Sequence, residues 1–188
     1  MLTDEDPVAQ IVFAGVVALR RPDQRRAADP WPADQAAQRI VEAGGTLICF
    51  DASCEVAIKQ LDLPLKNALE NVGSTEFYCP GSIVALSVDT AQPIARGFRS
   101  VVDAYFINSS AFESTGSGVR VIARYEKENL LRSGWLLGEE KLKGRIALAE
   151  VPVKKGRVVV FGFRPQHRGQ TWGTLSFIWN SINEGIRP

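Results

Sequence analysis

The chain has 188 residues, of which 45% are hydrophobic, and its 22 basic and 21 acidic side chains leave a formal net charge of +1. This length suffices for one domain with a sizeable core, and the composition is that of a globular rather than a disordered protein. The balanced charge gives no electrostatic support for nucleic-acid binding, and no apolar run is long enough to span a membrane.

The N-terminal part of the chain predicts a strand followed by a connector. The opening stretch MLTDED is acidic, the wrong charge for a signal peptide, so the chain offers no export signal and its localisation stays open. Residues 10–19 (QIVFAGVVAL) are apolar and β-branched and predict a buried strand. Residues 20–33 hold four arginines, three prolines and Trp31 without periodicity, which is typical of a loop. We therefore expect a strand and connector over residues 1–33 and one compact domain over residues 34–188.

The next segment alternates helical and strand patterns. Residues 34–43 have apolar positions at helical spacing, and Gly44 and Gly45 follow as a C-cap. Residues 46–50 predict a short buried strand, and residues 54–61 predict a second helix. This rhythm indicates a parallel sheet with helices on its faces.

The middle of the chain is rich in strand patterns. Residues 76–90 predict a strand that could be antiparallel to its neighbours, and residues 103–107 and 118–125 predict two more. A loop of serine, threonine and glycine separates these two strands. Trp135 is expected to fill the core, with a lid over a pocket as the alternative.

The C-terminal part predicts a hairpin, a polar loop and an amphipathic helix. Residues 146–153 and 157–163 are the two strands, joined by a short turn in which Gly156 would supply a positive φ. The polar loop contains His167, the only histidine of the chain. Thr171 can cap the following helix, which places five large apolar side chains on one face: Trp172, Leu175, Ile178, Trp179 and Ile182.

Three stretches together carry a family resemblance. They are GGTLICFDASCEVAIKQLDLPLKN, FYCPGSIVALSVDT and GWLLGEEKLKGRIALAEVPVKKGRVVVFGFRPQHRGQTWGT. Over residues 40–182 the chain resembles the C-terminal class I glutamine amidotransferase-like domain of bacterial zinc carboxypeptidase-family proteins. The resemblance implies a three-layer α/β fold of flavodoxin type with a mostly parallel central sheet. It also implies an accessory role beside a carboxypeptidase domain, in a family whose members are often exported.

The resemblance does not extend to a complete catalytic triad. A class I glutamine amidotransferase needs a cysteine on a tight strand-to-helix elbow, a histidine near the C-terminus and an acid two positions later. Here the elbow position falls on Asp51, Cys54 lies one helical turn later, and Gly169 stands where the acid is expected. A dyad of Cys54 and His167 remains a weak catalytic alternative, because both segments would lie at the carboxyl edge of the sheet.

The residue inventory predicts no metal and no cofactor. Zinc peptidases need two histidines and a glutamate, which one histidine cannot supply. The three cysteines, Cys49, Cys54 and Cys79, form no C-x-x-C pair and are expected to be small buried hydrophobes.

The carboxyl edge of the sheet is the predicted binding region. Asp51 and Ser53 follow one strand, and Arg164, His167 and Arg168 follow another. Because neighbouring parallel strands end at the same edge, we expect these residues to form a polar cluster, either a structural tie or a small-anion site.

Three functions follow from these observations. The favoured one is a non-catalytic accessory domain that presents a partner or a substrate. The second is a small cysteine-dependent hydrolase or amidotransferase relative that uses Cys54 and His167. The third is a small-ligand or anion-binding module with a pocket at the sheet edge lined by Asp51, Arg164, Arg168 and Trp135.

Overall fold

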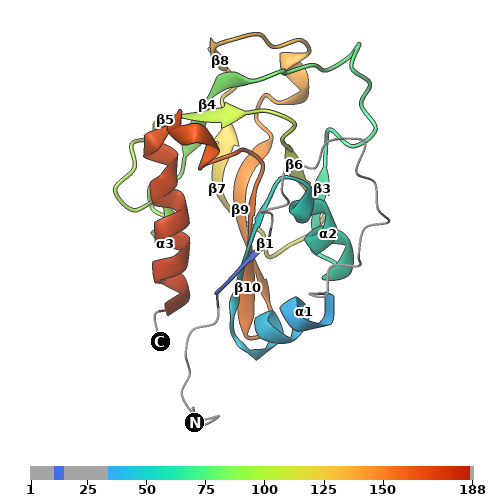
Figure 1. Cartoon of the computed structure of the whole chain (residues 1–188), viewed down its shortest axis with the longest axis vertical. Coiled ribbons are helices and arrows are strands. Elements are labelled where there is room, and N and C mark those ends of the chain that lie inside the picture. The colour runs from blue at the N-terminus through green and yellow to red at the C-terminus, as the bar shows by residue number, and fades with distance from the viewer. Residues whose placement is uncertain (1–10, 15–33, 187–188) are drawn as a thin grey trace.

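The computed structural model describes residues 11–14 and 34–186, and within them one ten-stranded mixed sheet dominates the fold (Figure 1). The strands are β1 (Ile11–Ala14), β2 (Thr46–Phe50), β3 (Leu65–Asn67), β4 (Ser82–Val88), β5 (Val101–Phe106), β6 (Phe112–Ser114), β7 (Arg120–Tyr125), β8 (Leu131–Ser133), β9 (Ile146–Val153) and β10 (Gly156–Phe161). The α-helices are α1 (Asp34–Ala43), α2 (Ala52–Gln60) and α3 (Leu175–Ile186). Four single turns of 3₁₀-helix are η1 (Pro93–Ala95), η2 (Glu139–Lys141), η3 (His167–Gly169) and η4 (Trp172–Thr174).

The parallel part of the sheet consists of β1, β2 and β10. β2 lies between the other two strands, with Phe50 opposite Phe161 of β10. Every residue of β2 is buried, as its short apolar sequence predicted. The N-terminal strand predicted over residues 10–19 is present as β1, and the remainder of that range, with the connector of residues 20–33, lies outside the described residues.

The rest of the sheet is antiparallel. The main path runs β1-β2-β10-β9-β7-β4-β5, with β3, β6 and β8 paired beside it. Within residues 11–14 and 34–186, two of the strand pairings are parallel and seven are antiparallel. The predicted hairpin over residues 146–161 is confirmed as β9 and β10.

The expected three-layer, mostly parallel, flavodoxin-like α/β fold is therefore wrong. Parallel neighbours need a long crossover, usually a helix, whereas antiparallel neighbours need only a turn. The alternation of helices and strands seen in residues 34–61 does not continue along the chain. Between β3 and β10 the chain has strands, turns and two single 3₁₀ turns, but no α-helix. The connections in this region therefore lead into antiparallel pairs.

Different helices cover the two faces of the parallel strands (Figure 1). In β10, Val158 and Val160 belong to the core cluster that includes α1 and α2, whereas Val159 and Phe161 belong to the cluster that includes Phe177 of α3. Alternate side chains of a strand point to opposite faces, so a continuous apolar run is buried on both sides. Each such side chain stabilises the fold by about 1.5–3 kcal/mol.

The turn between β9 and β10 differs from the expectation in one detail. The positive φ, 51°, falls on Lys154 and not on Gly156. Gly156 is needed for space, because a Cβ there would lie 2.2 Å from the carbonyl oxygen of Val41 and 2.3 Å from that of Gly45. The glycine thus lets the end of α1 approach β10 closely.

Candidate functional site

The predicted polar cluster at the carboxyl edge of the parallel strands is present in part. β2 and β10 are adjacent and parallel, so the segments that follow them leave the sheet at the same edge. Asp51 follows β2 and Arg164 follows β10, and Arg164 Nε lies 2.8 Å from Asp51 Oδ2. The Asp51 side chain is 20% exposed and the Arg164 side chain is 18% exposed, so the ion pair is largely buried. The expected approach of these two loops is confirmed.

Asp51 occupies a strained turn between β2 and α2. Its φ of 49° and ψ of −129° lie in a region that residues with a Cβ rarely adopt. Burial raises the pKa of the Asp51 carboxyl above its ordinary value of 3.8, and Arg164, which lowers the pKa, offsets only part of this effect. The ion pair is imperfect: Oδ1 is buried without a hydrogen-bond partner among the described residues, and the Arg164 Nε–H does not point along the short contact.

Ser53 supports this turn. Its hydroxyl donates to the Phe50 carbonyl oxygen at 2.6 Å and accepts from the Phe50 N–H at 2.9 Å. Ser53 is 8% exposed, so both bonds are shielded from water. These bonds tie the first turn of α2 to the end of β2 and hold Asp51 in its strained conformation.

His167 lies beside the ion pair on the loop that follows β10. Its ring stacks on Tyr105, with the centroids 4.5 Å apart and the planes 10° from parallel. Burial lowers the pKa of His167 below 6.5, and the neighbouring cations Arg164 and Arg168 lower it further. The imidazole is therefore neutral at pH 7. Arg168 itself is exposed and contributes charge rather than a contact with Asp51.

Cys54 lies in the core, whereas His167 lies on the partly exposed loop after β10. Cys54 is 0% exposed and belongs to the core cluster on the α1–α2 face, where its Sγ lies 3.4 Å from the Phe161 carbonyl oxygen. Burial raises the pKa of this thiol well above 9.0. Because the thiolate is the nucleophilic form, the local environment opposes activation of Cys54.

The other two cysteines are also buried thiols. Burial raises the pKa of Cys49 to about 12 and raises the pKa of Cys79 as well. All three cysteines are free, as expected for small hydrophobes. Over residues 11–14 and 34–186, no group of three or more histidine, cysteine, aspartate and glutamate side chains could hold a metal ion.

Three tryptophans lie outside the core, against expectation. Trp135 is 56% exposed and stacks edge-on against Tyr78, so the prediction of a core position is wrong. Trp172 and Trp179 are 78% and 63% exposed, whereas Leu175, Ile178 and Ile182 on the same predicted face are partly buried. The apolar face predicted over residues 172–182 is wider than the part that packs against the sheet. Trp172 and Trp179 lie at its solvent-exposed side.

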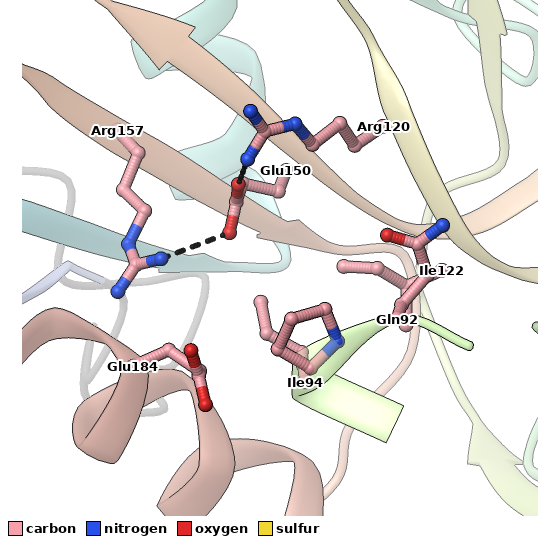
Figure 2. A pocket seen from close by; sticks show the side chains of 8 residues that line it. Gln92, Ile94, Arg120, Ile122, Glu150, Arg157 and Glu184 are labelled. Atoms are coloured by element: carbon pink, nitrogen blue, oxygen red, sulfur yellow. Dashed lines mark hydrogen bonds and ion pairs between the residues drawn. The ribbon is translucent and has the colours of Figure 1, made fainter. Parts of the chain in front are cut away.

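A second polar cluster, which sequence reasoning missed, surrounds Glu150 of β9 (Figure 2). The Glu150 side chain is 7% exposed, and its Oε1 accepts from Arg120 Nη1 at 2.7 Å. Its Oε2 lies 3.3 Å from Arg157 Nη1, and Arg157 Nε donates to Thr46 Oγ1 at 3.1 Å. A buried carboxylate is costly unless it is paired. In the sequence, Glu150 is the only charged residue of the apolar run IALAEVPV, and this isolated charge could have indicated the cluster.

The comparisons with known proteins identify the fold type but no family. No protein-family model matches the chain, and no curated protein sequence matches it. Among solved structures, the chain is similar to a β-galactosidase from Bacillus circulans sp. alkalophilus, at 13% identity and a TM-score of 0.51, over 96% of this chain and 22% of that chain. It is also similar to the N-terminal domain of mmIFT52, at 10% identity and a TM-score of 0.54, over 82% and 71%. A third similar structure is the cytoplasmic protein STM1381 from Salmonella typhimurium LT2, at 15% identity and a TM-score of 0.50, over 83% and 61%.

These similarities bear on the fold, and the sequence-based family resemblance stays a prediction. The chain spans about a fifth of the length of the β-galactosidase and about three fifths of STM1381. None of the three is described as an amidotransferase-like or carboxypeptidase-associated domain, and the sheet is mixed and mainly antiparallel. The expected amidotransferase-like α/β architecture is therefore wrong, and the comparisons give no support for an association with a carboxypeptidase. No helix among the described residues has the length and apolar character needed to cross a membrane.

Proposed function

We propose that this chain is a non-catalytic accessory domain that joins two copies of itself through the outer side of η4 and α3. The observation on which the proposal rests is the pair of exposed tryptophans, Trp172 at 78% and Trp179 at 63% exposure. α3 lies at one side of the fold, away from α1 and α2 (Figure 1). Exposed tryptophans mark interaction surfaces, because tryptophan is enriched among the residues that dominate binding energy.

A second copy of the chain is the partner that fits this surface. Ser176, Trp179 and Asn183 are exposed residues of α3 at helical spacing, and Trp172 is exposed on η4, the turn directly before α3. None of these four residues carries a charge, so this stripe can meet itself across a two-fold axis without like-charge repulsion. Each tryptophan brings about 150–250 Å² of contact area, a substantial share of the ~800 Å² per partner in a standard interface.

The absence of an activated nucleophile supports the non-catalytic part of the proposal. Among the described residues, the elbow between β2 and α2 presents Asp51 in an ion pair with Arg164, and Cys54 is buried with a raised pKa. Arg164 is already paired, which gives the small-anion alternative at this edge less support. The β-galactosidase similarity is consistent with an accessory role, since it covers 22% of that longer chain.

The oligomeric state tests the proposal directly. Sedimentation velocity over a series of concentrations should show a monomer–dimer equilibrium for the wild-type chain. The double substitution Trp172→Ala and Trp179→Ala should shift it to monomer. Trp135→Ala is the matched control, because it removes an equally large exposed side chain from a different surface and should leave the dimer intact. A wild-type chain that stays monomeric, or a control that dissociates equally, would contradict the proposal.

Thiol chemistry tests the non-catalytic part separately. In the native protein all three cysteines should react with a thiol-specific reagent far more slowly than free cysteine, because their pKa values are raised. After unfolding, all three should react readily. One cysteine that reacts unusually fast at neutral pH in the native state would favour the hydrolase alternative instead.

A further inference from the structure

A cavity of about 120 Å³ adjoins the Glu150 cluster (Figure 2). It lies between one face of the sheet and the layer formed by η1 and α3, on the side opposite α1 and α2. Its wall combines four charged side chains with apolar ones. The residues that define its chemistry are Ile94 of η1, Arg120 and Ile122 of β7, Glu150 of β9, Arg157 of β10 and Glu184 of α3.

The two arginines keep hydrogen-bonding capacity for a ligand. Each contacts Glu150 end-on, through a single Nη atom, and Arg157 adds one bond from Nε to Thr46. A guanidinium carries five N–H donors, so several donors of each arginine have no partner among the described residues. The two guanidinium groups pair with the same buried carboxylate, which holds both of them at the cavity wall.

A second carboxylate, that of Glu184, also lines the cavity. Glu184 projects from α3 toward the cavity, and its side chain is only 11% exposed (Figure 2). Its Oε1 also lies 3.4 Å from Arg96 Nη2, which holds the carboxylate in position. A carboxylate has about four acceptor sites, so it can accept a further donor while it keeps its existing contacts.

The charge pattern and the size select the class of ligand. Two arginines and two glutamates line the cavity, so a simple anion would meet Glu184 and a simple cation would meet Arg157. A molecule that carries both a negative and a positive charge can pair with the arginines and with Glu184. An engineered cavity of ~150 Å³ admits benzene, so about 120 Å³ accommodates roughly five or six non-hydrogen atoms.

We propose that this cavity binds a small free α-amino acid, with alanine as the best-fitting size. The carboxylate pairs with those N–H donors of Arg120 and Arg157 that have no partner among the described residues. The ammonium group pairs with Glu184, and the side chain rests on Ile94 and Ile122. This site is separate from the α3 surface proposed for self-association, and either proposal can fail without the other.

A ligand panel on the wild-type chain tests the charge requirement. L-alanine should raise the melting temperature in a dose-dependent manner, because a ligand that binds only the native state stabilises it by mass action. Propionate lacks the ammonium group, ethylamine lacks the carboxylate, and L-tryptophan exceeds the cavity, so these three should leave the melting temperature unchanged. No shift with alanine, or an equal shift with propionate, would overturn the proposal.

Substitutions locate the site by calorimetric titration with alanine. Glu184→Gln removes the partner of the ammonium group and should weaken binding by roughly 10- to 100-fold. Arg120→Gln should also weaken binding, while Arg157 still pairs with Glu150. Arg124→Gln is the matched control: it lies on the same strand, donates to the Gly144 carbonyl and does not line the cavity. Unchanged affinity in Glu184→Gln, or an equal loss in Arg124→Gln, would refute the assignment.

Discussion

Removal of the Arg164 side chain should destabilise the protein in a pH-dependent way. Arg164 is the main cation near the Asp51 carboxyl, whose pKa is already raised by burial. Arg164→Ala leaves the carboxylate in the same largely buried site without its partner. An unpaired buried charge lowers stability by more than the ion pair contributed. The exposure of 18–20% of the two side chains reduces this cost, so we expect the free energy of unfolding to fall by about 1–3 kcal/mol at pH 7. For a chain of this size the melting temperature should fall by roughly 2–12 °C.

The pH dependence follows from the direction of the Asp51 pKa. The folded-state pKa lies above the unfolded value of 3.8, so the folded state holds the proton more tightly and stability falls as pH rises between the two values. Without Arg164 the folded-state pKa of Asp51 rises further, so the pH range over which stability falls extends to higher pH. The stability difference between wild type and Arg164→Ala should therefore be largest near neutral pH and shrink as pH falls toward about 4.

Urea unfolding at about pH 7 and about pH 4 measures both effects. The exposed Arg168, substituted as Arg168→Ala, is the matched control and should change stability little. The double variant Asp51→Asn, Arg164→Ala should lose less stability than Arg164→Ala alone, because the buried negative charge is then absent. The reasoning would be refuted by a loss of the same size at both pH values, or by an equal loss in Arg168→Ala.

Three further predictions concern single positions. Gly156→Ala should lower stability by about 3 kcal/mol or more in urea unfolding, because its Cβ would overlap the carbonyls of Val41 and Gly45; a change below ~0.5 kcal/mol would contradict this close approach. The single histidine should titrate below 6.5 by proton NMR, and Arg164→Ala should raise the pKa of His167; a wild-type pKa at or above 6.5 would contradict the assigned environment. Cys54→Ala should cost about 1 kcal/mol and leave alanine binding and self-association unchanged, whereas loss of any measured activity would favour the cysteine-dependent alternative.

The sequence by itself determined the elements whose signals are local. The apolar run of β2, the hairpin of β9 and β10 and the polar loop after β10 could be predicted from periodicity and turn residues. The contact between Asp51 and Arg164 followed from them, because two adjacent parallel strands must end at the same edge of a sheet. These inferences needed only the order of neighbouring elements along the chain.

Only the tertiary structure decided the pairing of the remaining strands and the direction of several side chains. The local patterns of β4, β5 and β7 indicate strands, but their antiparallel pairing depends on contacts between residues distant in sequence. A tryptophan on an apolar helical arc is buried only if the neighbouring layer reaches it, and no layer of the described residues covers Trp172 or Trp179. The burial of Cys54 and the two arginines around Glu150 likewise depend on packing between separate strands and helices, which local sequence patterns do not encode.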